Sequence, residues 1–310
     1  MTTHEQSEPN PQNDLSPWFF GRKKIRRRSR AQANALFWAA ILLLPAVIAL
    51  FALRIIPLID AFRTALVSEP GENPFGVFEY VLTDPGFINS LKVTLIFSVI
   101  VNPLQIALAM WLAVVLVKHI PLVGLWRTLI LLPIAVPQSV SAIIWLVLFR
   151  PDGPLNGILE RLGIPAVPWL TSPEFALPSI IIVVSWVGVG YWMTFLVTGI
   201  KDIPESLYEA SELDGAGGWK KFWFITLPGV RRTLLFVLVA DTVANFLVFA
   251  PVRLMTQGGP EGSTNLLMND IFETAYALGD MPAASAQTII LVLIVVAVVA
   301  VQFKLLPGKD

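Results

Sequence analysis

Six stretches of this chain are apolar for about twenty residues each, and this pattern limits the fold more than any other feature. They lie at about 36–58, 91–117, 128–149, 179–200, 233–252 and 284–306. A helix needs roughly 20 apolar residues to cross a bilayer. Strands with free edges would leave backbone groups unpaired in lipid, and these stretches are too long and too unalternating for barrel strands. The sequence therefore predicts an all-α membrane protein with six transmembrane helices.

The composition agrees with a lipid environment. Of the 310 residues, 55% are hydrophobic and 14% are charged, whereas soluble domains carry about 25% charged residues. No cysteine is present, and the two histidines, His4 and His119, lie far apart. Disulfides, thiolate metal sites and other metal or catalytic clusters are therefore not predicted. The net charge of zero gives no field that would favour a nucleic-acid partner.

Lysine and arginine are unevenly distributed between the apolar stretches. They gather in RKKIRRRSR at 22–30, in the loops 118–127 and 201–232, and after the last stretch. The segments 59–90, 150–178 and 253–283 are poorer in basic residues. Because basic loops remain on the cytoplasmic side, both termini are predicted to be cytoplasmic, as an even number of spans requires. The predicted organisation is a basic cytoplasmic tail, 1–34, followed by a transmembrane domain, 35–308. A nucleic-acid-binding arm is the less favoured interpretation of the tail.

The loop at 201–232 reads KDIPESLYEASELDGAGGWKKFWFITLPGVRR. We expect two short helices, with Asp202 as the N-cap of the first and Pro204 in its first turn. Glycines at 215, 217 and 218 should end that helix, because glycine accepts the left-handed conformation after a C-terminus. Such a glycine-broken helix would suit a segment that lies across the membrane surface and docks on a partner.

The same loop resembles the EAA loop of ABC importer permeases. That pattern is Glu-Ala-Ala, three residues, Gly, nine residues, Ile, one residue and Leu-Pro. This chain matches every spacing, and its only departure is a serine for the second alanine. The resemblance implies an ATPase-coupling element made of Glu209, Ala210, Ser211, Gly215, Ile225, Leu227 and Pro228. The segments 78–95 and 145–165 are similar to the family's entry to its second span and to its third span with the outer loop. The LYEASELDGAG form is similar to the carbohydrate branch, and 255–267 resembles the outer loop before the last span in the maltose-type and glycerol-phosphate-type first subunits.

The resemblance implies a transporter subunit and not an enzyme. No Gly-x-x-x-x-Gly-Lys-Ser/Thr stretch occurs, so we expect no cofactor on this chain and expect ATP with Mg²⁺ to bind a separate ATPase. The implied partners are a second homologous permease subunit, an ATPase dimer and an extracytoplasmic solute-binding protein. The implied location is the bacterial inner membrane. The implied solute is a sugar, oligosaccharide, polyol or glycerol-phosphate ester.

Polar and aromatic residues inside the predicted spans are candidates for the solute pathway, because polar groups in lipid are costly. Asp241 and Asn245 share one face of the fifth span, and the second span offers Asn102 and Gln105. The pathway candidates are Asp241, Asn245, Gln138, Ser141, Trp145, Trp186, Tyr191 and Trp192. Interhelical hydrogen bonds and interfacial aromatic residues would explain the same residues without a solute.

Two other functions are compatible with a membrane bundle. An ion-gradient-driven secondary carrier would need ionisable relays inside the spans, and this chain offers little beyond Asp241. A lipid-modifying enzyme would need a cluster of His, Asp or Glu, which the sequence lacks. The prolines at 45, 103, 133 and 137 are interpreted as packing kinks, and 154–163 as a surface amphipathic helix.

Overall fold

The computed structural model describes residues 30–66, 73–118 and 121–305, and every regular element in those ranges is helical. The predicted basic tail lies outside the described residues, apart from its last positions. The chain divides into two compact units, 1–56 and 57–310, which are considered separately. The first contains α1 (Arg30–Leu50) and the π-helix η1 (Phe51–Ile55); the boundary falls at the start of α2 (Ile56–Leu66).

Five helical segments are long and apolar enough to cross a membrane. They are Phe37–Leu66, Pro85–Val117, Pro173–Lys201, Arg231–Met255 and Met281–Leu305. Each coincides with one of the predicted apolar stretches, so those five predictions are confirmed.

The third predicted span is not one straight helix. Val123–Ala135 and Gln138–Leu148 meet at a bend of 99°. Between α5 (Val123–Leu131) and α6 (Gln138–Leu148) the chain forms the 3₁₀ turn η2 (Leu132–Ala135), and Val136 is extended at ψ 125°. Proline disfavours the helical region for the residue before it, and here Val136 is extended, so the helix is broken before Pro137 instead of kinked. The packing-kink interpretation is therefore wrong for this pair, whereas Pro45 and Pro103 lie within continuous helices.

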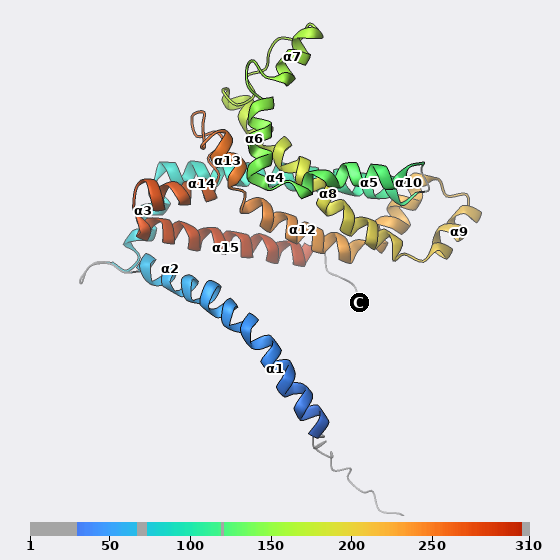
Figure 1. The fold of residues 1–310 in the computed structure, drawn as a ribbon, viewed down its shortest axis with the longest axis horizontal. Coiled ribbons are helices and arrows are strands. Elements are labelled where there is room, and N and C mark those ends of the chain that lie inside the picture. The colour runs from blue at the N-terminus through green and yellow to red at the C-terminus, as the bar shows by residue number, and fades with distance from the viewer. Residues whose placement is uncertain (1–29, 67–72, 119–120, 306–310) are drawn as a thin grey trace, which may run out of the picture. The chain divides into compact units, whose positions relative to one another are not determined.

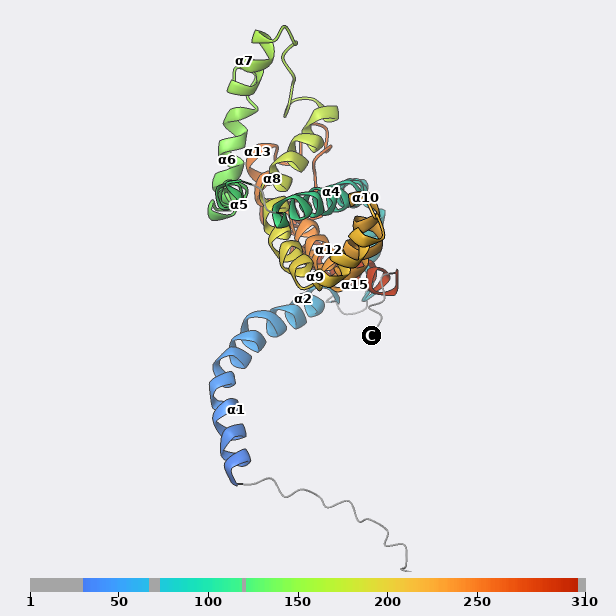
Figure 2. The same cartoon turned by 90° about the vertical axis from the view of Figure 1, so that its right-hand side faces the viewer.

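The second unit is built around α4 (Pro85–Val117), α8 (Pro173–Lys201), α12 (Arg231–Phe246) and α15 (Met281–Leu305), which run side by side (Figures 1 and 2). Glycines on α8 permit this close approach. A methyl group on Gly188 would come within 2.6 Å of Gln105 Oε1, and one on Gly190 would strike the Ile130 carbonyl oxygen.

A buried cluster at the end of the bundle nearest the 201–232 loop anchors that loop; we call it the loop-side cluster. Its members are Ala109, Met110, Ala113, Leu116, Trp192, Met193, Leu196, Ile200, Ile203, Val230 and Val237.

Shorter helices connect the bundle. They are α3 (Gly76–Thr83), α7 (Pro154–Arg161), α9 (Glu205–Leu213), α10 (Gly218–Lys221), the π-helix η3 (Phe222–Thr226), α11 (Leu227–Gly229), α13 (Ala250–Met255), α14 (Leu267–Phe272) and the π-helix η4 (Glu273–Ala277). The predicted helix at 154–163 is confirmed as α7. In both views α6 and α7 extend away from the four-helix bundle (Figures 1 and 2). The fully buried Asn156 holds the following segment by bonding the Val167 backbone and the Trp169 indole.

Candidate functional site

The 201–232 loop contains a short helix that ends at a left-handed glycine. Gly215 has φ +71°, and α9 closes with bonds from the Gly215 N–H to the Glu212 carbonyl (3.0 Å) and from the Ala216 N–H to the Ser211 carbonyl (2.9 Å). The predicted break at Gly215 is confirmed. Gly217 and Gly218 have another role, because Gly217 precedes α10 with φ −69° and Gly218 begins it.

Asp202 does not cap α9 as the sequence suggested. The preceding helix α8 continues to Lys201, and the Asp202 N–H donates to the Thr198 carbonyl at 3.1 Å. Asp202 is therefore the C-cap of α8. Pro204 then adopts an extended ψ of 129°, and α9 begins at Glu205. The N-cap prediction is wrong because the long helix extends further than its apolar stretch.

The distal end of the loop holds α9 in place. The Tyr208 hydroxyl bonds the Thr226 hydroxyl at 3.0 Å, and Lys221 Nζ lies 2.6 Å from Glu212 Oε1. Ile225 and Leu227 are partly buried against the loop-side cluster. The Ile-x-Leu-Pro spacing thus positions an anchor for the helix, with Thr226 as its middle residue. The sequence analysis did not single out Tyr208 or Thr226, since neither belongs to the spacing pattern.

The opposite side of the loop is exposed and carries large apolar groups. Leu213 is 91% exposed, Trp219 74% and Phe224 79%, and Glu209 and Ala210 are exposed beside them. These residues lie outside the candidate spans. Several large apolar side chains exposed in one loop outside lipid make that loop a candidate for contact with another protein.

A buried polar network crosses the bundle. Asn245 Nδ2 donates to Asp241 Oδ1 (3.1 Å) and to Asn102 Oδ1 (2.7 Å). Asn102 donates to Thr242 Oγ1 (3.2 Å), and Gln105 donates to Ser185 Oγ (3.3 Å). The structure therefore joins the predicted pair from the fifth span to the polar residues of the second.

Thr242 is a further member of this network, and it also accepts a 2.7 Å bond from Gln302 at the end of α15. Sequence reasoning missed both residues. The only available signal was the amide of Gln302 at the end of an otherwise apolar stretch. Asp241 Oδ2 is buried and has no hydrogen-bond partner within the described residues.

The aromatic candidates form a second group along α6 and α8. The Trp145 and Trp186 rings lie 5.7 Å apart at 74°. Ser141 Oγ and Trp145 Nε1 are buried without a hydrogen-bond partner in the part of the chain that the structure describes. Tyr191 and Trp192 stack edge to face further along α8, at 4.7 Å. Gln138 is exposed at the start of α6 and joins neither group.

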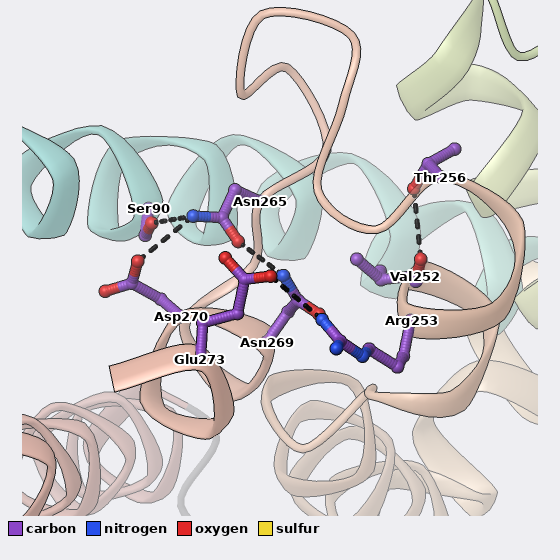
Figure 3. Close-up of polar contacts among 8 residues, drawn as sticks. All are labelled: Ser90, Val252, Arg253, Thr256, Asn265, Asn269, Asp270 and Glu273. Carbon is purple, nitrogen blue, oxygen red and sulfur yellow. Dashed lines mark hydrogen bonds and ion pairs between the residues drawn. The ribbon is translucent and has the colours of Figure 1, made fainter. Parts of the chain in front are cut away.

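A polar cluster that the sequence analysis did not anticipate lies in the segment 250–280, from α13 to the start of α15 (Figure 3). Asp270 accepts bonds from Asn265 Nδ2 (3.0 Å) and Gln287 Nε2 (3.2 Å), and Asn265 also donates to Ser90 on α4 (2.8 Å). Burial raises the pKa of the Asp270 carboxyl above its ordinary value, despite the opposing hydrogen bond from Asn265. Arg253 pairs with Glu273 at 2.9 Å beside this cluster.

Further bonds fasten the same segment to α4. Asn89 Nδ2 donates to the Gly262 carbonyl at 3.1 Å, and the Leu267 N–H donates to Thr94 Oγ1 at 2.8 Å. Gly262 has φ +72°, and a methyl group there would lie 2.9 Å from Asn89 Nδ2. The segment 250–280 is therefore held to the first part of α4 by polar contacts.

The chain is similar in sequence to a known protein family and to several characterised transport proteins. The family described as "Binding-protein-dependent transport system inner membrane component" matches residues 105–308. The chain is 36% identical to the sn-glycerol-3-phosphate transport system permease protein of Agrobacterium fabrum, over 73% of this chain and 78% of that protein. It is 32% identical to the trehalose/maltose transport system permease protein of Thermococcus litoralis, over 85% and 92%.

The fold is similar to that of a solved protein. A chain of a bacterial ABC transporter involved in the import of the acidic polysaccharide alginate matches with a TM-score of 0.79 and 22% identity, over 89% of this chain and 96% of that chain. A second structure of the alginate transporter, in complex with a periplasmic protein bound to an alginate pentasaccharide, matches with a TM-score of 0.76.

Proposed function

The chain belongs to the family of inner membrane components of binding-protein-dependent transport systems, and from this premise we propose that it forms half of the solute channel of an ABC importer and is coupled to a separate ATPase through the 201–232 loop. The observation that carries the coupling proposal is the exposed apolar surface around Leu213, presented by a helix that Gly215 ends and Thr226 anchors. ATP-driven closure of an ATPase dimer would move α9, and the anchor would pass this motion to the bundle.

The residues of the EAA pattern have different roles in this coupling element. Glu209 and Ala210 lie on the exposed side, where an ATPase would touch them. Ser211 fits in place of alanine because its hydroxyl donates to the Tyr208 carbonyl within the helix at 2.7 Å. Gly215 ends the helix, and Ile225, Leu227 and Pro228 lead the chain back to the bundle.

We propose a sugar or a related solute, such as an oligosaccharide, polyol or glycerol-phosphate ester. The relatives are named for glycerol phosphate and trehalose/maltose. The unpaired Ser141 hydroxyl and Trp145 indole offer hydrogen bonds, and the Trp145 and Trp186 rings offer apolar faces for a sugar ring. The buried pair Asp241 and Asn245 would contribute hydrogen-bonding groups from the polar network that crosses the bundle.

The remaining partners follow from the same premise. They are a second homologous permease subunit, an ATPase dimer that binds ATP and Mg²⁺, and an extracytoplasmic solute-binding protein. The periplasmic protein in the alginate complex supports the last of these. The distribution of basic residues supports cytoplasmic termini, with the 201–232 loop on the ATPase side.

Vesicles that contain this chain and its sister permease, with the binding protein and a labelled sugar outside, test the proposal. Uptake should require both ATP and the ATPase subunit. Uptake that persists without the ATPase and follows an imposed ion gradient would overturn the proposal and favour the secondary carrier.

A further inference from the structure

A cavity of about 420 Å³ lies between the 201–232 loop and the ends of α4 and α8. Five helical elements contribute to its lining, which comes from the last turns of α4 and α8 and from α9, α10 and η3. The lining residues are Val114, Val117, Lys118, Ile200, Lys201, Ile203, Glu205, Tyr208, Glu212, Gly218, Lys221, Phe222 and Thr226. No residue of this cavity belongs to the solute-pathway groups described above.

The charges around the cavity are unevenly balanced. Lys221 is paired with Glu212, and Glu205 lies in the first turn of α9, where the helix dipole favours a negative charge. Lys118 and Lys201 remain, both exposed and neither within an ion pair among the described residues. Three lysines against two glutamates leave the lining with one net positive charge. The cavity thus favours an anion next to its two exposed lysines.

Apart from Gly218 and the hydroxyl-bearing Tyr208 and Thr226, the rest of the wall is apolar. Val114, Val117 and Phe222 pack against the loop-side cluster, together with Ile200 and Ile203, which belong to it. A hydrated free anion gains nothing from such a wall, whereas a lipid brings a charged headgroup and an apolar chain together. Basic pockets between transmembrane helices on the cytoplasmic side are suited to anionic phospholipid headgroups.

We infer that this cavity binds an anionic phospholipid of the cytoplasmic leaflet, with Lys118 and Lys201 at the headgroup phosphate and Val114, Val117 and Phe222 along the start of an acyl chain. This inference rests on the proposed function, because it places the 201–232 loop at the cytoplasmic surface. A lipid seated there contacts both the loop and the ends of α4 and α8. It therefore braces the coupling helix against the bundle, and its loss should weaken the link between ATP hydrolysis and transport.

The test uses the complete transporter, with its sister permease and ATPase, in nanodiscs of phosphatidylcholine with or without phosphatidylglycerol. Native mass spectrometry measures retained phosphatidylglycerol, and the ATPase rate is measured on the same samples. The variant Lys118→Gln/Lys201→Gln should bind phosphatidylglycerol roughly twentyfold more weakly than the parent protein, since each lysine near an anionic surface contributes several-fold. The control Lys220→Gln/Lys304→Gln removes the same charge from two exposed lysines outside the cavity and should retain the lipid.

Several outcomes would overturn the inference. Equal lipid retention by both double variants would show that the cavity lysines do not hold the headgroup. Displacement of phosphatidylglycerol by inorganic phosphate would identify a free anion as the ligand. Loss of the ATPase subunit from the Lys118→Gln/Lys201→Gln variant would assign the lysines to a protein contact. A parent complex that binds its ATPase but shows no preference for phosphatidylglycerol would defeat this inference alone, whereas a parent chain that binds no ATPase would defeat the proposed function.

Discussion

The 201–232 loop and the segment 250–280 each connect two long helices, yet they are fastened to the bundle in different ways. The first exposes Leu213, Trp219 and Phe224 and is anchored mainly through Tyr208, Thr226 and the Glu212–Lys221 pair. The second also exposes Tyr276 and Leu278, but its largely buried polar groups bond it to α4 through Asn265, Gly262 and Leu267. An exposed apolar surface suits a partner that moves the loop, whereas a buried polar network holds one geometry. The contrast agrees with the proposal that the 201–232 loop transmits motion, and it suits a role of the segment 250–280 in holding the helices in one arrangement.

The largest effect should come from the left-handed turn of the 201–232 loop. Gly215→Val places a β-branched residue at φ +71°, which costs roughly 1–2 kcal/mol or more. Helix α9 can then no longer end in its present geometry, so ATP-dependent uptake into vesicles should fall by at least about tenfold. Gly217→Val is the matched control, because Gly217 has φ −69° and open space around it. Equal uptake by the two variants would contradict the role of the turn.

The next effect concerns the stability of the segment 250–280. Asn265→Leu leaves Asp270 and Ser90 without their shared donor, and an unsatisfied buried polar group costs about 1–3 kcal/mol. The midpoint of thermal unfolding in detergent should fall, while the ATPase should still bind the folded protein. Gln138→Leu changes an exposed amide at the start of α6 and serves as the control. An unchanged midpoint for Asn265→Leu would show that the network does not hold the segment.

A smaller effect is expected from a change on the exposed surface of the 201–232 loop. Leu213→Ser should weaken assembly with the ATPase by about five- to tenfold, because an exposed apolar side chain at an interface contributes roughly 1 kcal/mol or more. Leu278→Ser removes a side chain that is 77% exposed in the segment 250–280 and should leave assembly unchanged. Co-purification and titration of the ATPase measure both. A stronger effect at Leu278 would reverse the comparison between the two regions.

The smallest effect is the pH dependence of the segment 250–280. Burial raises the pKa of Asp270 above 3.8, so the folded protein holds this proton more tightly than the unfolded chain. Its contribution to the free energy of unfolding should therefore increase as the pH falls through the raised pKa toward 3.8. Asp270→Asn should remove this part of the pH dependence of thermal unfolding, whereas Asp280→Asn, at the start of α15, should retain it. A parallel pH response in the parent protein and Asp270→Asn would contradict the assignment.

Local sequence patterns predicted much of the fold and part of the site. Hydropathy located five spans, because a lipid-facing helix must be apolar along its whole length. Gly215 in the 201–232 loop marked the end of a helix, because glycine adopts a positive φ such as +71° without strain. The four-residue spacing of Asp241 and Asn245 placed them on one face, and they are hydrogen-bonded. The packing-kink interpretation of Pro133 and Pro137 was wrong, because these prolines flank a 3₁₀ turn at which the chain bends by 99°.

The sequence alone determined where helices run, where the 201–232 loop breaks and which polar residues enter the bundle, because these depend on neighbours within one or two turns. Tertiary structure decided which residues meet across the bundle. Asn245 is hydrogen-bonded to Asn102, 143 positions away in the sequence, and Asn265 to Ser90, 175 positions away. Hydrogen bonds of this kind are set by how whole helices pack against one another, and no local periodicity records the partner that packing supplies.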